Sequence, residues 1–333
     1  MHGAIIDTIS AGGNGGLVGA GDVATRLMQS GFNVNALRTN AVLRKDEWSQ
    51  YDQALVEVAR SRLPLVTALV NAGLTYNISN GLGTTILEWE NVSDMEAADV
   101  SMAGVTEGEQ DTLAFQLQSM PLPIIHKDFT LNIRKLEASR STGQPLDTAQ
   151  AALAGRKVAE TTEAMVILGH ATRVGASQIY GLSTEPNRNT RTMTNLWDTT
   201  TTATEYIVDI LASIASLQAD DMYGPYALIV NYTTWNRMLN DYEQTTSTGK
   251  TIHGRISEIP DISNVIPSKD VPANAAFLFQ LTNDVIDEVI GMQPTVVQWE
   301  SQGGMQLHFK VMSIMIPRVR STQTLQSGIV HIS

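Results

Sequence analysis

The chain has 333 residues and a mass of 36.1 kDa, a size that suits one large domain or two intertwined ones. Hydrophobic residues make up 43% of it and charged residues 17%, a composition that excludes an intrinsically disordered protein. Because 34 acidic residues outnumber 22 basic ones, giving a formal net charge of -12, a general nucleic-acid reader is also not expected.

The absence of cysteine removes further classes of protein. Disulfide scaffolds, cysteine-type zinc sites, iron–sulfur clusters and thiol nucleophiles all need a residue that the chain lacks. Residues 1–10 have neither a basic start nor a long apolar stretch, so no secretory signal is expected. No segment approaches the roughly 20 apolar residues of a membrane span. We therefore expect a soluble protein made in a cytoplasm, with no membrane partner.

The N-terminal part begins with a glycine-rich segment. Within residues 1–25, six glycines follow in quick succession between positions 12 and 21, which indicates a segment that is flexible or is ordered only by contact with something else. From residue 45 to 69 the apolar spacing predicts a helix, which Pro64 is expected to kink or end.

Residues 63–126 have an unusual charge pattern, because they contain no lysine or arginine and eight acidic residues. Alternating pieces at 84–89 and 112–118 flank the acidic stretch and predict the two strands of an extended hairpin. An isolated hairpin is marginally stable in water. The acidic stretch is therefore either a solvated loop or part of an arm that lies on a neighbouring subunit.

A strand is predicted over residues 127–136, where apolar and polar residues alternate. Gly143 and Pro145 then break the chain before the strongest helix pattern, over about 146–170, with Pro145 suited to its first turn. At 1.5 Å per residue this helix would be about 35–40 Å long. Such a length is unusual in a globular domain.

The rest of the chain predicts a mixed α/β region followed by strands. Amphipathic spacing predicts a helix at 203–219, and a turn at 223–225 leads into a buried strand at 226–230 and a short helix at 233–242. Residues 180–204 and 243–254 have the composition of loops. Further strands are expected at 275–281, 295–300 and 306–316, and there is no internal repeat.

The strongest enzymatic motif is Gly19–Ala24, which fits the G-x-G-x-x-A form of the dinucleotide-binding fingerprint. That fingerprint needs a buried strand before the glycines, so that a pyrophosphate meets a helix N-terminus. The glycine-rich residues 12–18 cannot form this strand, and no acidic residue follows Val34 to hold a ribose. A nicotinamide-dependent enzyme built on Gly19–Ala24 is therefore kept only as an alternative.

Other residue types that could support chemistry are scattered. No two of the six histidines have the spacing of metal ligands, and His170 is interpreted as a helix C-cap facing the helix dipole. The pair Asp220–Asp221 is expected to end a helix, and Glu88 and Glu90 are expected to lie on a solvated strand face. We predict no catalytic, cofactor-binding or metal-binding residue, no cofactor and no enzymatic activity.

The order of these parts resembles the major capsid proteins of tailed bacteriophages, which have the Hong Kong 97-type fold, and its encapsulin-like branch in particular. Two segments carry the local likeness. The first is residues 125–147, in which the strand leads into the alanine-rich long helix, and the second is Gly224–Asn231, which is followed by a helix with Trp235 and Leu239. The resemblance covers about residues 70–320. It implies an α+β fold with an N-arm, an extended E-loop hairpin, a P-domain with a long spine helix and β-sheet, and an α/β A-domain.

On this resemblance the chain divides into six parts. They are an N-terminal arm at 1–45, the N-terminal helix region of the P-domain at 46–74, the E-loop at 75–118, the P-domain at 119–179 with its spine helix at 146–170, the A-domain at 180–290, and returning P-domain and A-domain strands at 291–333.

The resemblance implies a major capsid protein, or head protein, that self-assembles into the icosahedral shell around the double-stranded DNA genome of a tailed phage. The expected location is the virion, after assembly in the host cytoplasm. The expected partners are other copies in hexamers and pentamers, scaffold, portal and cement or decoration proteins, and packaged DNA through non-specific contact. The alternative within this fold is an encapsulin-type nanocompartment shell around a cargo enzyme.

One departure from the family pattern concerns shell cross-linking. Some members form a covalent bond between an E-loop lysine and an asparagine of a neighbouring subunit, and residues 63–126 contain no lysine. We therefore expect a non-covalent shell. Acidic E-loop residues such as Glu107 and Glu109 are expected to dock on basic residues of an adjacent subunit. The candidate basic residues are Arg134, Lys135, Arg140, Arg156 and Lys157.

Overall fold

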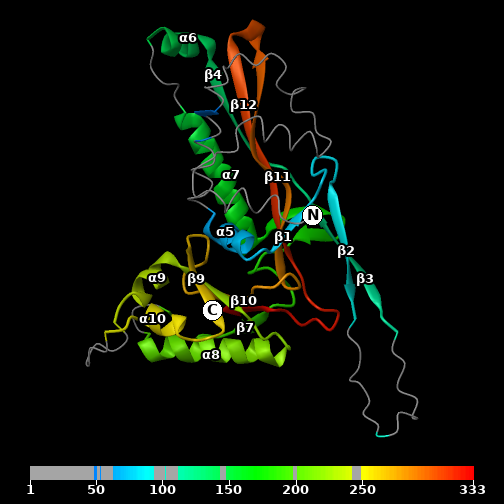
Figure 1. The fold of residues 1–333 in the computed structure, drawn as a ribbon, viewed down its shortest axis with the longest axis vertical. Coiled ribbons are helices and arrows are strands. Elements are labelled where there is room, and N and C mark those ends of the chain that lie inside the picture. The colour runs from blue at the N-terminus through cyan, green and yellow to red at the C-terminus, as the bar shows by residue number, and fades with distance from the viewer. Residues whose placement is uncertain are drawn as a thin grey trace.

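The computed structural model describes residues 63–93, 112–142, 148–197, 201–241 and 249–333, together with the single positions 49, 50, 53 and 102. These residues form an elongated α+β molecule with a tall upper sheet, a smaller lower sheet with helices, and a hairpin along one side (Figure 1).

The upper body is a four-stranded sheet backed by a long helix. The strand order is β1-β11-β12-β4, with β11, β12 and β4 antiparallel and β1 parallel to β11. Helix α7 packs along one face of the sheet over buried side chains such as Leu307, Phe309 and Val311, which alternate with more exposed residues along β12. The elements are β1 (Thr75–Asn77), β4 (Ile125–Asn132), α7 (Ala149–Leu168), β11 (Ile286–Ser301), the 3-10 turn η1 (Gln302–Gly304) and β12 (Gln306–Val319).

The lower body is a five-stranded sheet in the order β7-β13-β10-β8-β9. Its central strands β8 and β10 are buried on both faces, which suits their nearly continuous apolar sequences. Helix α8 covers one face, and its start is fixed by a capping box in which Thr202 N donates to Glu205 Oε2 at 2.7 Å. The elements are β7 (Asn189–Arg191), α8 (Ala203–Ala219), β8 (Tyr226–Asn231), α9 (Tyr232–Met238), α10 (Ile252–Ser257), β9 (Ile262–Ser268), β10 (Ala276–Gln280) and β13 (Ile329–Ile332).

A third hydrophobic cluster joins the two bodies. It combines Leu65 and Leu69 of helix α5 (Pro64–Asn71), Val166 of α7, Phe277 of β10 and Met315 of β12. Strand β11 begins in this cluster and strand β12 ends in it, and the rest of both strands lies in the upper sheet (Figure 1). The junction is therefore a packed core.

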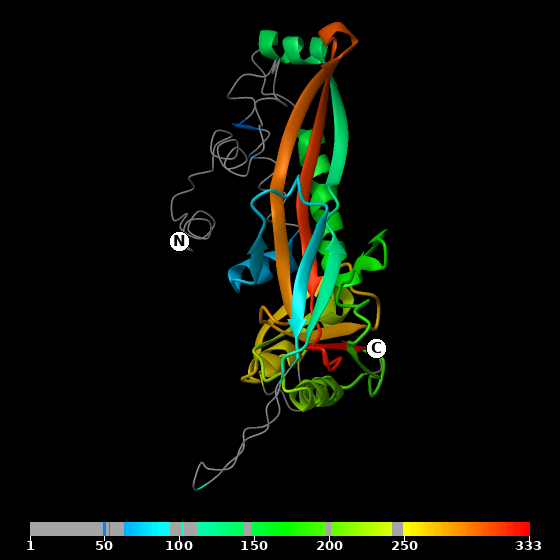
Figure 2. The ribbon, with the colours of Figure 1, turned by 90° about the vertical axis from the view of Figure 1, so that its right-hand side faces the viewer.

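The hairpin lies beside the upper sheet (Figure 2). Its strands β2 (Ile86–Val92) and β3 (Phe115–Pro121) pair in antiparallel register from Ile86 opposite Pro121 to Val92 opposite Phe115. A second small sheet, formed by β5 (His170–Val174) and β6 (Ser177–Ile179), contacts β3.

Several predicted elements are confirmed. The helix at 203–219 and the buried strand at 226–230 occur with the expected bounds or within one residue of them. The hairpin forms as expected, with strands that begin two or three residues later than predicted. The strands expected at 275–281 and 306–316 also occur, as β10 and β12.

The break predicted at Pro64 occurs, because Leu63 is not helical and Pro64 takes the first position of helix α5, where the missing N–H costs no hydrogen bond; most of residues 45–62 lie outside the described residues. Other predictions are wrong at their ends. The strand expected to reach residue 136 ends at Asn132, whose Oδ1 accepts a hydrogen bond from Arg134 N at 2.9 Å and starts helix α6 (Ile133–Thr142). Helix α9 ends at Met238, four residues before its predicted end.

The long helix is also shorter than predicted, because α7 starts at Ala149. Pro145, which was predicted to stand in its first turn, lies outside the described residues. Gly169 is the C-cap of α7, with a φ of 68°, and the expectation that His170 caps the helix is wrong. His170 begins β5, and its Nδ1 forms a hydrogen bond with Thr172 Oγ1 at 2.7 Å. Glycine accepts the positive φ at this position more readily than histidine.

Gly81, in the turn that leads into the hairpin, packs directly against the backbone of β11. A Cβ atom at Gly81 would lie 2.5 Å from the carbonyl carbon of Gly291, where the register of β11 against β12 shifts. We expect Gly81→Ala to lower the free energy of unfolding by about 1–3 kcal/mol, because backbone atoms must separate. Thermal melting checks this, with the exposed Ser79→Ala as a matched control, and equal melting of both variants would contradict it.

Candidate functional site

The two faces of the β2–β3 hairpin differ in character. On one face Trp89 and Met120 turn toward the rest of the molecule, and Met120 is buried. On the opposite face Phe115 is 61% exposed and Leu117 is 62% exposed. We call the apolar side chains of this second face, Ile86, Val92, Phe115 and Leu117, the hairpin outer face. Glu88 and Glu90 lie between Ile86 and Val92 on the same face, so the apolar side chains are concentrated at Val92, Phe115 and Leu117. A group of exposed apolar side chains is typical of a surface that another molecule covers.

The hairpin is held against the body by hydrogen bonds to the segment after β12. Asn91 Nδ2 donates to Ser321 O at 2.9 Å. Gln323 Nε2 donates to Ala114 O at 2.9 Å and to Asn91 O at 3.2 Å. These bonds join residues more than 200 positions apart in the sequence, so they fix the direction of the hairpin relative to the body.

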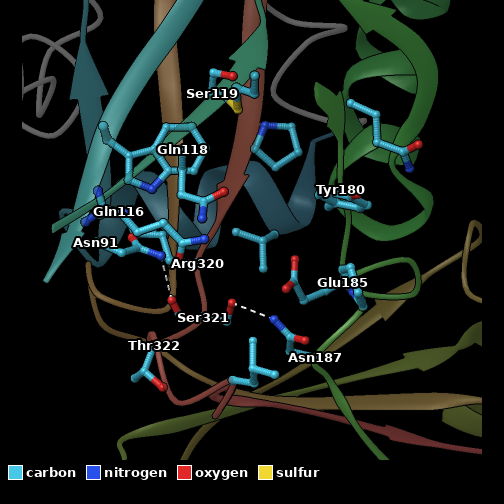
Figure 3. A pocket seen from close by; sticks show the side chains of 17 residues that line it. Asn91, Gln116, Gln118, Ser119, Tyr180, Glu185, Asn187, Arg320, Ser321 and Thr322 are labelled. Carbon is cyan, nitrogen blue, oxygen red and sulfur yellow. Dashed lines mark hydrogen bonds between the residues drawn. The ribbon is translucent and has the colours of Figure 1, made fainter. Parts of the chain in front are cut away.

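A cavity of about 220 Å³ lies between the hairpin, residues 178–187 and residues 317–325 (Figure 3). Its walls are mainly polar. The labelled side chains come from the hairpin (Asn91, Gln116, Gln118, Ser119), from the segment after β6 (Tyr180, Glu185, Asn187) and from the segment at the end of β12 (Arg320, Ser321, Thr322).

Glu185 is the buried acid of this cavity. Burial raises the pKa of its carboxyl group to about 7, while hydrogen bonds from the Asn187 backbone and the Ser321 hydroxyl act in the opposite direction. Asn187 Nδ2 also donates to Ser321 Oγ at 2.9 Å. Glu185 thus belongs to a hydrogen-bonded wall that ties residues 185–187 to the segment holding the hairpin.

A buried ion cluster supports the hairpin from below. Arg318 Nε donates to Asp287 Oδ1 at 2.9 Å, and Arg320 Nη2 donates to Asp287 Oδ2 at 2.8 Å. The Arg318 guanidinium also lies 4.5 Å from the ring centroid of Tyr76 and 5.7 Å from that of Trp89. Cation–π contacts of this kind attract the arginine to both rings. Trp89 of the hairpin is therefore packed over a fixed charge pair.

The predicted carboxylate positions have the expected structural roles. Glu88 and Glu90 are exposed on β2, as predicted for a solvated face. Asp220 is the C-cap of α8, and Asp221 follows with a φ of 60°, so this pair ends a helix. Within the described ranges, no three His, Cys, Asp or Glu side chains are close enough to hold a metal ion.

The predicted basic docking residues fall into two groups. Arg134 and Lys135 are exposed on α6. Arg156 and Lys157 instead bind Glu160 within α7, at 2.8 Å and 2.9 Å, and lower the pKa of that carboxyl group to about 2. Their charges are therefore already partly neutralised inside the subunit. Glu107, Glu109, the side chain of Arg140 and the motif Gly19–Ala24 lie outside the described residues.

The sequence reasoning missed the ion cluster and the hydrogen bonds that hold the hairpin. A signal for the cluster was present, because Asp287 interrupts an apolar run and Arg318 and Arg320 alternate with apolar residues. Pairing them requires knowing that β11 lies beside β12. The hairpin contacts of Asn91 and Gln323 have no local signal, since their partners are distant in sequence. In the part of the chain that the structure describes, no helix is long and apolar enough to cross a membrane.

Comparison with protein families and curated proteins finds relatives in sequence. A model described as a family of unknown function, DUF6260, matches residues 35–332. The type 1 encapsulin shell protein EncA of Myxococcus xanthus (strain DK1622) is 27% identical over 206 residues. That match covers 61% of this chain and 66% of the relative, slightly less than two thirds of its length.

Comparison with solved structures finds similar folds at low sequence identity. A virus-like particle from Pyrococcus furiosus matches with a TM-score of 0.62 at 17% identity, covering 85% of this chain and 98% of that one. The capsid of Myoviridae phage XM1 matches with a TM-score of 0.61 at 11% identity, covering 80% and 91%. The capsid of an empty GTA particle matches with a TM-score of 0.55 at 12% identity, covering 80% and 89%.

Proposed function

This chain belongs to the DUF6260 family and has the Hong Kong 97-type fold of capsid and encapsulin shells, and from these premises we propose that it is the major capsid protein of a tailed bacteriophage. In this proposal the chain assembles, as hexamers and pentamers, into an icosahedral shell around double-stranded DNA. It reaches the virion after assembly in the host cytoplasm. Scaffold, portal and cement proteins are its further partners.

The observation that carries this proposal is the hairpin outer face. A hairpin with two 60%-exposed apolar side chains on its free face is costly for an isolated subunit and is stabilised when a neighbour covers it. The hydrogen bonds to residues 321 and 323 hold the hairpin in one direction, as repeated contact between identical subunits requires. The net charge of -12 also suits a container whose wall does not immobilise DNA.

The assignment of parts follows the same fold. We assign residues 1–45 to an N-terminal arm and 46–74 to the start of the P-domain. The hairpin region at 75–118 is assigned as the E-loop and 119–179 as the P-domain with spine helix α7. Residues 180–290, which supply most of the lower body, are assigned as the A-domain, and 291–333 as strands that return to both domains.

An encapsulin-type compartment is the second candidate. It is favoured by the sequence match to an encapsulin shell protein of Myxococcus xanthus and by the fold match to the virus-like particle of Pyrococcus furiosus. In both candidates the subunit has a structural role and is not an enzyme. They differ in what the shell encloses.

Negative-stain electron microscopy of the chain expressed alone tests the proposal. Closed shells tens of nanometres across are the expected result, and nucleic acid or a co-purifying protein in the interior separates the phage candidate from the compartment. A chain that stays monomeric both alone and when co-expressed with its neighbouring genes would contradict both candidates.

The assembled shell is expected to be non-covalent, because no lysine occurs in residues 63–126. Shells boiled in SDS should run as a single band at the 36.1 kDa of the subunit. An untreated sample, kept intact on a native gel, serves as the control for assembly. A ladder of cross-linked species above the monomer would show that another lysine forms a bond between subunits.

A further inference from the structure

Two buried glutamates influence each other electrostatically near the junction of the upper and lower bodies. Glu163 of α7 accepts hydrogen bonds from the backbone N–H groups of Leu65 at 2.9 Å and Val66 at 3.3 Å. These are donors in the first turn of α5, which have no partner within their own helix. The carboxyl group of Glu163 therefore fastens the start of α5 to α7.

Glu288 of β11 is 0% exposed, and the charge of Glu163 acts on its carboxyl group. Neither of its carboxyl oxygens has a hydrogen-bond partner among the described residues. The preceding residue, Asp287, lies beside Arg318 and Arg320 and is fully paired. Adjacent positions of one strand thus hold an acid paired with two arginines and an acid whose carboxyl group has no hydrogen-bond partner among the described residues.

The charged groups around this pair favour the protonated form. Burial raises the pKa of Glu288 well above its usual value, and the neighbouring Glu163 and Asp287 raise it further. Burial also raises the pKa of Glu163 to about 7, against the two backbone hydrogen bonds, with Asp270 adding to the rise and Lys269 opposing it. Lys269 Nζ also lies 3.3 Å from Glu160 Oε1, so the charge of Lys269 is already partly neutralised by Glu160.

We propose that Glu163 and Glu288 form a proton-dependent lock that holds α5 and β11 against α7. With a proton bound by the pair, the junction contains at most one negative charge, which the start of α5 stabilises. When both protons leave for solvent, two like charges face each other in an apolar core and the junction loosens. This inference concerns contacts inside one subunit and does not depend on shell formation.

The direction of the pH effect follows from the raised pKa. Near pH 4.5 and below, both the folded and the opened junction hold the proton, so the lock adds no pH dependence. As pH rises from there to about 7, the opened form releases its proton first, and the folded junction becomes progressively less stable. For Glu163 alone, moving from pH 6 to pH 8 is expected to raise the open fraction about tenfold.

Hydrogen exchange measured by mass spectrometry tests this on the full-length chain. Protection of peptides covering residues 63–77, corrected for the pH dependence of intrinsic exchange, should fall at least tenfold from pH 6 to pH 8 in the wild type, because Glu288 adds to the effect of Glu163. Glu163→Gln keeps an oxygen acceptor for α5 and cannot ionise, so its protection should fall clearly less than that of the wild type over this range. Glu88→Gln, at an exposed position on β2, is the control and should behave as the wild type.

Glu288→Gln provides an independent variant, which should also reduce the loss of protection as pH rises, and protection in the double variant should stay level. The lock is overturned if wild-type protection of residues 63–77 changes less than twofold between pH 6 and pH 8. It is equally overturned if the glutamine variants that fold lose protection as the wild type does. Because exchange is read within the subunit, a chain that fails to form shells can still show the lock.

Discussion

Replacing both Phe115 and Leu117 with glutamate is expected to abolish shell assembly while leaving the subunit folded. Both side chains are more than 60% exposed, so charged residues at these positions cost the isolated subunit little. In an assembled shell, burial of each side chain by a neighbour contributes about 1.5–3 kcal/mol, and a buried unpaired carboxylate is far less favourable. Light scattering and electron microscopy should show particles for the wild type and small species for the variant.

A conservative pair separates loss of an apolar contact from a general effect on the hairpin. Phe115→Leu with Leu117→Met keeps an apolar outer face of similar size and should still assemble. Circular dichroism and melting should show that both variants keep the fold. If the glutamate variant forms closed shells in wild-type yield, the hairpin outer face is not a subunit contact and the observation behind the proposed function fails.

The elements predicted correctly are those whose signals are local. Helix α8 has an apolar stripe, with Tyr206, Ile210 and Ile214 buried, and a capping box at its start. Strand β8 is a short apolar run bounded by a turn, and its burial on both faces follows from that composition. These features need no knowledge of distant contacts.

The errors occur where a local pattern has two interpretations. The alternation of Phe129, Leu131 and Ile133 extends past the true end of β4, but Asn132 caps a helix that starts at the next residue. Similarly, β11 was expected only over 295–300, whereas it begins at Ile286. Asp287 and Glu288 interrupt its apolar pattern, and only the partner strand, which supplies Arg318, shows why Asp287 is tolerated there.

The candidate site was predicted in outline and not in detail. The acid-rich sequence without lysine or arginine and its flanking strands indicated a projecting hairpin, which the structure contains. The wall that positions the hairpin, built from Arg318, Ser321 and Gln323, comes from the other end of the chain. Contacts over such sequence distances depend on the topology of the sheets, and no pattern within either segment encodes them.

Among the variants that affect folding, removal of Asp287 is expected to cause the largest loss of stability. The Asp287 side chain is 4% exposed and that of Arg318 is 5% exposed, so Asp287→Ala leaves a buried guanidinium without its counter-ion. Breaking a buried pair in this way typically costs about 3–5 kcal/mol. The melting temperature of the subunit should fall by on the order of 10 °C. Loosening of the hairpin should accompany it, because Trp89 packs over Arg318.

Two further variants decide whether the unpaired charge is the cause. Asp287→Leu combined with Arg318→Met removes both charges and should recover much of the lost stability, since an apolar pair of similar volume often replaces a buried ion pair without cost. Arg320→Ala should cost no more than about 1 kcal/mol, because Arg320 is 26% exposed and Arg318 still neutralises Asp287. If the double variant melts as low as Asp287→Ala, the lost stability does not come from an unpaired buried charge. It then comes from the loss of the packing contacts that the Asp287 and Arg318 side chains make.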